Sequence, residues 1–273
     1  MKRKGFKGIL LLLSMLFALT GCSVSEATQH GMAVDTIQAE DVLLRVDFLN
    51  VGQADCALLS TNGHYMVIDG GNNGDADTIL SYLEGQGVEK LDAVVGTHPH
   101  EDHIGSLDAI INHFDVDAVY MPKIMHTSKT FEDVLDAVAN KGLKIKSPSP
   151  GDTIDFNGLE IEVLGPQREY KDFNNNSIVL KVNAGETAFL FTGDAEETAE
   201  KDILQADYDL QADVLKVGHH GSSTSSSQAF FLVVKPQYAV ISVGVGNSYH
   251  HPEEEALQRL QSIGAEIYRT DLQ

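Results

Sequence analysis

Short apolar runs, each bounded by Gly, Asn or Asp, recur along the chain from residue 41 to its end. The runs are rich in Val, Ile, Leu and Phe and extend over about four to eight residues, a pattern that predicts β-strands. The pair Asn157-Gly158 between two such runs predicts a tight hairpin turn. The expected strands are 42–49, 57–60, 65–68, 93–96, 118–121, 153–156, 159–164, 177–182, 188–191, 214–217, 238–243 and 266–268.

Segments with apolar residues at helical spacing separate these runs and predict α-helices. Strands and helices occur in both halves of the chain, which suits two sheets packed face to face with helices outside. No linker rich in Pro, Gly or Ser divides this region, so we expect residues 41–273 to form one domain. The predicted fold class is α+β, a four-layer αββα sandwich. The expected helices are 77–84, 104–113, 131–140, 196–205, 228–234 and 253–263.

The N-terminus has the pattern of a leader. The basic segment Lys2–Lys7 precedes the apolar run Ile9–Leu19, which is too short to span a bilayer comfortably. The run ends in the sequence LTGC at Cys22, which resembles the lipobox of bacterial lipoproteins. In that class the cysteine carries lipid and becomes the first mature residue. We therefore expect residues 1–21 to be a lipoprotein signal peptide; the alternative is an ordinary secretory leader with an incidental cysteine.

This leader predicts an extracytoplasmic protein that is lipid-anchored to the bacterial cell membrane through Cys22. Residues 22–40 are small and polar, and we expect them to form a flexible tether. The chain has two cysteines, so a lipidated Cys22 leaves Cys56 without a partner and excludes an intrachain disulfide. Cys56 lies in an apolar run, which favours buried packing over a role as nucleophile or ligand.

The composition indicates a globular chain with a strongly acidic surface. The 273 residues are 42% hydrophobic and 22% charged, with a formal net charge of -21. Four of the 19 basic residues lie in the leader, which has no acid, so the remainder carries 15 basic residues against 40 acids, a net charge of about -25. Such a surface repels polyanions at long range. We therefore expect no general basic face, and DNA would be met only at a local site.

Residues 97–105 read THPHEDHIG, and the pattern H-x-H-x-D-H within them places three imidazoles and the carboxylate of Asp102 within six positions. Neutral imidazole and carboxylate are ligands that zinc, manganese and iron accept. Four potential ligands in one short segment favour two metal ions side by side over a solvated polar loop. Histidine pairs at 219–220 and 250–251 and the acid Asp194 also follow predicted strands. Because strand ends meet at the rim of a sheet, we expect them to share one site, although a helix cap is the alternative for Asp194.

Seven segments follow one another in an order that resembles a known family. They are Phe48–Cys56 (FLNVGQADC), Ile68–Gly71 (IDGG), His98–Gly105 (HPHEDHIG), Asn175–Leu180 (NNSIVL), Thr192–Asp194 (TGD), Leu215–Ser222 (LKVGHHGS) and Asn247–Pro252 (NSYHHP). Together they resemble the metallo-β-lactamase superfamily, and most closely its ComEC-type branch, which is linked to competence and DNA internalisation. The resemblance covers about residues 42–271. It implies the αββα fold and a binuclear metal-dependent hydrolase, and Asn50 departs from an acid usual in the family.

The resemblance also implies roles for the candidate residues. His98 and His100 would hold the first metal ion, Asp102 and His103 would hold the second, and Asp194 would bridge the two. Asp102 is in addition a candidate catalytic residue.

The last ligand stays open between two later segments. His219 and His251 each match the position of the final ligand in different relatives, and both are candidate metal ligands. His220 is a candidate catalytic residue that donates a proton to the leaving group or binds a substrate oxyanion. His250 is the expected bystander, since the family pattern lacks it.

Two further features bear on how the metals are held. Asp55 and Asp69 are expected at the rim, where each would orient a ligand histidine from behind. Many members of the superfamily supply a further histidine between the first cluster and the Gly-Asp motif. The corresponding stretch 174–177 has none, so we expect one metal to be held less fully by protein.

The expected cofactors are two divalent ions, zinc or manganese, with iron as a third choice. Such ions lower the pKa of bound water from about 15.7 towards 7, and a bridging hydroxide would be the nucleophile. The resemblance implies a phosphodiesterase, either nuclease-like or acting on a phosphoester at the cell surface. The alternatives are a superfamily hydrolase of a thioester, lactone or β-lactam, and a non-catalytic, metal-stabilised lipoprotein that binds a surface partner, which Asn50 favours. The sequence predicts no oligomeric state.

Overall fold

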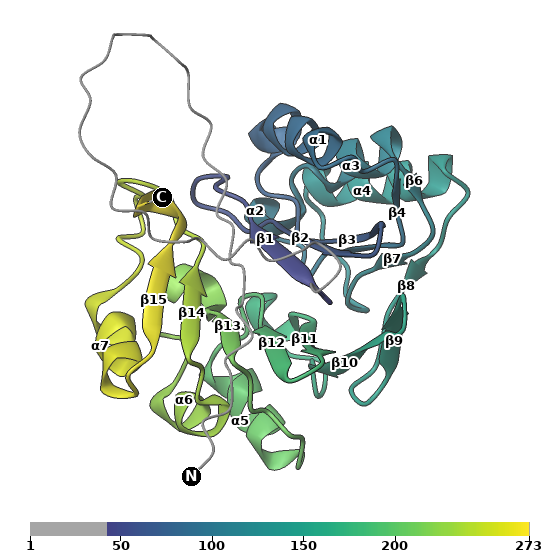
Figure 1. Cartoon of the computed structure of the whole chain (residues 1–273). Helices are drawn as coiled ribbons and strands as arrows, with labels where there is room; N and C mark the ends of the chain where they lie inside the picture. The colour runs from purple at the N-terminus through teal and green to yellow at the C-terminus, as the bar shows by residue number, and fades with distance from the viewer. Residues whose placement is uncertain (1–42, 273) are drawn as a thin grey trace, which may run out of the picture.

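The computed structural model describes residues 43–272. The predicted signal peptide, the tether and the lipidated Cys22 therefore lie outside the described residues. Two large β-sheets pack face to face, and helices cover the outer face of each (Figure 1). The predicted four-layer αββα sandwich is confirmed.

The first half of the chain builds a six-stranded sheet in the order β1-β2-β3-β5-β7-β8. Strands β1 to β3 are antiparallel, and the remaining pairs are parallel because helices connect them. The strands are β1 (Arg45–Phe48), β2 (Ala57–Thr61), β3 (His64–Ile68), β5 (Ala93–Val95), β7 (Val119–Tyr120) and β8 (Ile145–Lys146), and β4 (Lys90–Leu91) pairs separately with β6 (Asp115–Val116). The helices of this half are η2 (Asn73–Asp75), α1 (Ala76–Gly85), α2 (Glu101–Ile104), α3 (Leu107–His113) and α4 (Lys129–Asn140).

The second half builds a seven-stranded sheet in the order β15-β14-β13-β12-β11-β10-β9. Its first four strands along the chain are antiparallel and its last three are added in parallel. The strands are β9 (Thr153–Phe156), β10 (Leu159–Gly165), β11 (Val179–Ala184), β12 (Thr187–Phe191), β13 (Val214–Lys216), β14 (Tyr238–Ile241) and β15 (Glu266–Arg269). The helices are η3 (Asn174–Asn176), α5 (Glu197–Gln205), η4 (Gly218–Gly221), α6 (Gln228–Val234), α7 (Glu254–Ser262) and η5 (Thr270–Leu272). Among residues 43–272, no helix has the length and the apolar composition that crossing a membrane requires.

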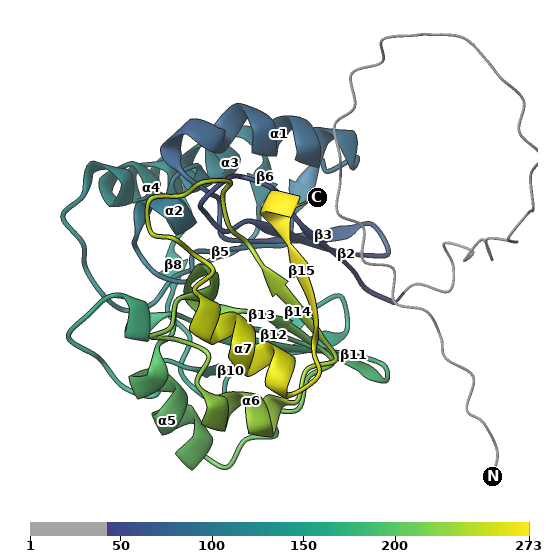
Figure 2. The ribbon, with the colours of Figure 1, turned by 90° about the vertical axis from the view of Figure 1, so that its left-hand side faces the viewer.

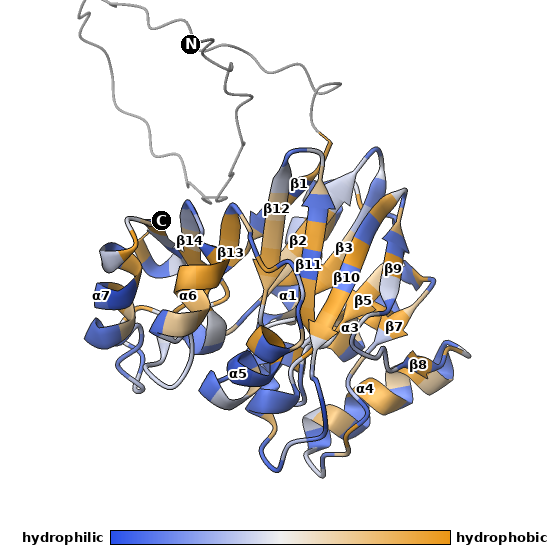
Figure 3. Ribbon diagram, turned by 90° about the horizontal axis from the view of Figure 1, so that it is seen from below, coloured by the Kyte–Doolittle hydropathy of each residue, from blue (hydrophilic) through white to orange (hydrophobic). Residues whose placement is uncertain are grey.

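The strand period of two distributes apolar side chains between three cores. In β2, Leu58 packs under α1, α3 and α4, whereas its neighbour Leu59 packs between the sheets. In β12, Phe191 lies between the sheets and Leu190 packs under α5 and α6. Figure 2 shows α1, α3 and α4 on one side of the strands and α5, α6 and α7 on the other. Figure 3 shows long hydrophobic stretches along the strands and mostly hydrophilic residues on α5. Each fully buried Leu contributes about 1.5–3 kcal/mol, so these faces hold the layers together.

The predicted hairpin is confirmed, because Asn157 and Gly158 both have positive φ (50° and 83°) between the paired strands β9 and β10. The predicted helix 104–113 is wrong in its boundaries, since α2 begins at Glu101 and a break at Gly105 separates it from α3. At Gly105 a Cβ would lie 2.2 Å from the carbonyl carbon of Asn72. The absence of a side chain at Gly105 therefore lets the segment that carries the metal-ligand motif dock against the backbone at Asn72.

Candidate metal centre

The candidate residues follow four strands that end at the same rim of the sandwich. His98 follows β5, Asp194 follows β12, His219 and His220 follow β13, and His251 lies in the loop after β14. Parallel strands with their carboxyl ends at one edge bring such loops together. The rim borders a cleft of about 340 Å³. It is lined by Gln53, His100, Glu101, Asp102, Asn174, Asp194, His219, His220, Tyr249 and His251.

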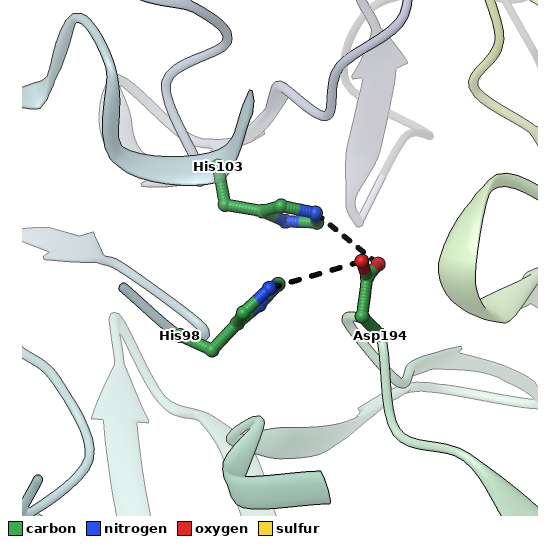
Figure 4. Close-up of side chains that lie close together, drawn as sticks. All are labelled: His98, His103 and Asp194. Carbon is green, nitrogen blue, oxygen red and sulfur yellow. Dashed lines mark ion pairs between the residues drawn. The ribbon is translucent and has the colours of Figure 1, made fainter. Parts of the chain in front are cut away.

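His98 and His103 both point at the carboxylate of Asp194 (Figure 4). The Nε2 of His103 lies 3.1 Å from Oδ1 of Asp194, and the Nε2 of His98 lies 3.7 Å from its Oδ2. All three side chains are buried. Apart from this contact with each other, the Nε2 of His103 and the Oδ1 of Asp194 have no hydrogen-bond partner within residues 43–272. Buried polar atoms rarely lack a partner, so these atoms face a place suited to a cation.

His220 joins the same cluster from the second sheet. Its Nε2 lies 3.2 Å from Oδ2 of Asp102 and 3.9 Å from Oδ2 of Asp194. Its Nδ1 donates to the backbone carbonyl of Ser242 at 3.0 Å. With one proton held on Nδ1 by Ser242, Nε2 is the nitrogen that could bind a metal ion in place of its own proton, as in metal-ligating histidines.

The two predicted orienting acids lie behind the histidines. The Oδ2 of Asp69 accepts from Nδ1 of His103 at 2.8 Å, and Thr97 donates to Asp69 through both its backbone N–H and its hydroxyl. Asp55 lies behind His220, with Oδ1 3.2 Å from Nδ1. Asp69 therefore fixes the tautomer of His103 and turns Nε2 to the cleft.

The other predicted ligands lie at the cleft wall. The Nδ1 of His100 lies 3.0 Å from Nε2 of His98, so two ring nitrogens from one motif converge. His219 places Nε2 3.7 Å from Asp194 and Nδ1 3.3 Å from Oε1 of Glu196. The ring of His251 lies 5.6 Å from that of His219, and its Nδ1 is buried without a hydrogen-bond partner in the described part of the chain.

The backbone at the histidine pair 219–220 is strained. His219 and His220 both have positive φ (50° and 52°), which costs non-glycine residues about 1–3 kcal/mol each. The strain turns consecutive imidazoles towards the same cleft, one from its mouth and one from its buried end. Neighbouring Gly221 also has positive φ (82°), and a Cβ there would press on Pro252 at 2.6 Å.

Burial and opposite charges set the ionisation of this cluster. Burial, followed by the charge of His103, holds the pKa of His98 well below its usual value, which leaves the neutral imidazole that metals bind. Burial alone would raise the pKa of Asp194, but His103 and His220 hold it well below the usual range. Burial alone would lower the pKa of His220, but the negative charges of Asp194 and Asp55 outweigh burial and raise this pKa to about 10.

These residues fit divalent metal ions. Two overlapping groups of three ligand atoms each lie within 4.8 Å, His98–His103–Asp194 and Asp102–His103–His220, and each joins imidazole with carboxylate. A third such group, Asp55–Asp69–His103, lies behind the first two. Within residues 43–272 neither His219 nor His251 joins such a group. Their roles as ligands therefore remain predictions, whereas His220 belongs to one of these groups.

Sequence reasoning did not single out Lys216, whose ammonium lies 2.7 Å from Oδ2 of Asp55, with both side chains buried. Lys216 interrupts the apolar run VLKVG, and a lone lysine in a buried strand was the available signal. Next to Asp55, Cys56 is buried as expected, and burial raises the pKa of its thiol well above the usual value.

A family model described as "Metallo-beta-lactamase superfamily" matches residues 49–245. The chain is 31% identical over 245 residues to ComE operon protein 3 of Bacillus subtilis (strain 168), covering 83% of this chain and 32% of that protein. It is 32% identical over 226 residues to competence protein ComA of Neisseria gonorrhoeae, covering 82% of this chain and 30% of that protein. The chain thus spans about a third of the length of these curated relatives. The metallo-β-lactamase fold protein YhfI from Bacillus subtilis superposes with a TM-score of 0.56 at 12% identity, over 83% of this chain and 95% of YhfI.

Proposed function

The chain belongs to the metallo-β-lactamase superfamily, and its similarity to two competence proteins supports the ComEC-type branch. From this premise we propose that it is a metal-dependent phosphodiesterase that acts outside the cytoplasm. The observation that carries the proposal is the buried convergence of His103 and His98 on Asp194, whose facing atoms have no other hydrogen-bond partner in the described chain.

The chain's own side chains divide the work at the cleft. His98, His100, His103, Asp194, Asp102 and His220 would hold two divalent ions, zinc, manganese or iron. Such ions supply an acidified water and stabilise negative charge on a phosphoryl oxygen.

His219 is placed to move a proton. Its side chain is 23% exposed at the cleft, with Nδ1 against Glu196 and Nε2 turned inwards. Through Nε2 it would donate a hydrogen bond to a phosphoryl oxygen or a proton to the leaving group, a contribution of about 10²–10⁴ in rate.

The charge around the cleft favours small or surface-bound phosphodiesters over a long polyanion. Glu101 lines the cleft, Glu196 borders it, and the chain has a net charge of -21. The serine-rich loop 222–227 lies beside the cleft. It offers few hydrogen-bond donors to a phosphate, because the backbone N–H and the hydroxyl of Ser223 already donate to Glu253. Exposed Tyr249 and half-buried Gln53 are neutral groups at the cleft that could contact the rest of a substrate.

Hydrolysis of bis(p-nitrophenyl) phosphate by the purified full chain tests the proposal. We expect activity that chelation removes and that manganese or zinc restores. Asp102→Ala should lower the rate at least about 100-fold, whereas His113→Ala should not, since His113 pairs with Glu84 on the surface far from the cleft. A protein that carries two metals and cleaves no phosphodiester, with Asp102→Ala without effect, would end the proposal.

The same preparation separates the alternatives. A thioester, a lactone and a β-lactam are assayed in parallel, and cleavage of one of these alone assigns a different reaction. If none of these substrates is cleaved, the alternative of a non-catalytic, metal-stabilised binding protein is favoured. Nicking of supercoiled plasmid in the presence of manganese distinguishes DNA from smaller phosphodiesters.

The proposed location rests on the leader and is tested separately. In cells that export the protein we expect it in the membrane fraction, accessible to added protease from outside. Cys22→Ser should release it from that fraction. Retention of the Cys22→Ser protein with membranes would contradict a lipid anchor at this residue.

A further inference from the structure

The three consecutive asparagines of η3 have two different roles: two of them hold the local backbone in place, and one lines the cleft. The side chain of Asn175 accepts from the backbone N–H of Glu196 at 3.2 Å and of Ala199 at 3.0 Å. The side chain of Asn176 accepts from the backbone N–H of Tyr170 and donates to its carbonyl. Both are buried, and the Nδ2 of Asn175 donates to the carboxylate of Asp172 at 2.9 Å. These two residues hold η3 in place and leave Asn174 to face the cleft.

The amide of Asn174 has a fixed orientation and an oxygen without a partner. Its Nδ2 donates to Oε1 of Glu196 at 3.3 Å. Because a carboxylate cannot donate, the amide cannot turn its oxygen to that side. The Oδ1 is buried and has no hydrogen-bond partner within residues 43–272. The residue lines the cleft together with His100 and Asp194.

The surroundings of Asn174 are those of a ligand rather than of a loop residue. Glu196, which holds its amide, also lies 3.3 Å from Nδ1 of His219 and accepts from the hydroxyl of Thr224 at 3.0 Å. One carboxylate thus orients an amide and an imidazole at the same cleft. A buried amide oxygen without a partner is costly, and a cation would satisfy it.

His126 is the other side chain beside this position. Its ring lies 6.4 Å from that of His100, but Phe173 packs against both rings, at 4.6 Å from His126 and 5.7 Å from His100. Its Nδ1 accepts from the backbone N–H of Ser128. His126 does not line the cleft, whereas Asn174 does.

We propose that Oδ1 of Asn174 is an oxygen ligand of the metal held by His98 and His100, in the place where many superfamily members have a third histidine. This proposal shares with the proposed function the premise that metal ions occupy this centre, and it does not depend on the reaction that they support. An amide oxygen is a hard ligand, and replacing nitrogen by oxygen shifts a site from zinc towards manganese. Asn174 would therefore select the metal as well as hold it.

Titration calorimetry of the chelator-stripped full chain with manganese and with zinc tests this role without any substrate. Asn174→Leu keeps the size and removes the oxygen, and should weaken one of two manganese sites by about 10–100-fold. Asn174→His should favour zinc over manganese relative to the parent protein. The matched control is Asn183→Leu, because Asn183 is also half-buried and donates to a glutamate, Glu162, but lies on β11 away from the cleft.

Unchanged manganese affinities at both sites in Asn174→Leu would overturn the proposal. If the leucine variant does not fold, Asn174→Asp and Asn174→His decide, since the aspartate should favour manganese and the histidine zinc; equal preferences refute the role. A parent protein that binds two ions but cleaves no phosphodiester refutes the proposed reaction alone. A parent protein that binds neither ion refutes both.

Discussion

The ammonium of Lys216 lies 2.7 Å from Oδ2 of Asp55, and both side chains are buried directly behind His220. Burial alone would raise the pKa of Asp55, but Lys216 and His220 hold it below the usual value. A buried carboxylate that loses its cation is left uncompensated, which costs about 3–5 kcal/mol. We therefore expect Lys216→Met to lower the free energy of unfolding by about that amount, measured by urea denaturation.

Lys181→Met is the matched control for this substitution. Lys181 is an equally buried lysine of the same sheet, but its partner Asp209 is 75% exposed, so water can solvate the carboxylate that remains. The control should therefore lose much less stability than Lys216→Met. Adding Asp55→Asn to Lys216→Met should recover part of the loss, because no buried charge then stays unpaired. Equal losses in the two lysine variants would refute this account.

The layers could be predicted because they depend on local periodicity. Leu58 and Leu59 are adjacent apolar residues, yet the strand period sends them into different cores, and runs of this kind indicate strands buried on both faces. The two-residue strands β4, β6 and β8 are too short to show a period. The break at Gly105 depends on contact with Asn72, which no local pattern reveals.

In the metal centre, too, the residues that share one local motif could be predicted, whereas the contacts between distant segments could not. His98, Asp102 and His103 lie in one motif, so their proximity follows from the sequence itself. The pairing of Lys216 with Asp55 joins two sheets through residues far apart in the chain, and only the packed sandwich shows it. Likewise Asn174 is one of three asparagines, and the hydrogen bonds of its neighbours distinguish it.

Metal removal should destabilise the protein through the cluster at Asp194. Stripping the ions leaves His103 Nε2 and Asp194 Oδ1 buried with only each other as partners. Ligand binding to the folded state alone adds about 2.7 kcal/mol at 100 times Kd. We expect a lower melting temperature after chelation, restored by manganese or zinc. His103→Ala should abolish this metal-dependent shift, and surface His113→Ala should retain it. A melting temperature that chelation leaves unchanged would argue against stabilising ions here.

Gly105→Ala should disturb the docking of the metal-ligand motif. The new Cβ would lie 2.2 Å from the carbonyl carbon of Asn72, so backbone must move, at about 1–3 kcal/mol or more. The control is Gly85→Ala at the end of α1, where no atom lies within 4 Å of the added Cβ. Alanine is favoured over glycine in helices by up to about 1 kcal/mol, so the control should be neutral or stabilising. Urea denaturation of both variants measures the contrast, and similar effects at the two glycines would disprove the steric argument.

Glu200 should make stability depend on pH through the loop that follows His220. Its buried carboxylate accepts from the backbone N–H groups of Ser226 and Ser227. Burial raises its pKa above 4.5, although the bonds from Ser227 and the charge of Arg259 oppose the rise. Because the folded pKa is raised, the stabilising contribution is fully present below the unfolded pKa and is lost as pH rises through the folded pKa.

The substitution Glu200→Gln isolates this contribution, because glutamine does not ionise and offers one acceptor oxygen in place of two. We expect it to cost about 1–3 kcal/mol through the unpaired N–H, with the deficit largest near pH 4 and smaller near pH 7. Glu197→Gln on the exposed face of the same helix should change stability by less than about 0.5 kcal/mol. Urea denaturation of the three proteins from pH 4 to pH 7 measures both effects. A deficit in Glu200→Gln that grows with pH would contradict the raised pKa, since the parent protein would then gain stability on ionisation of Glu200.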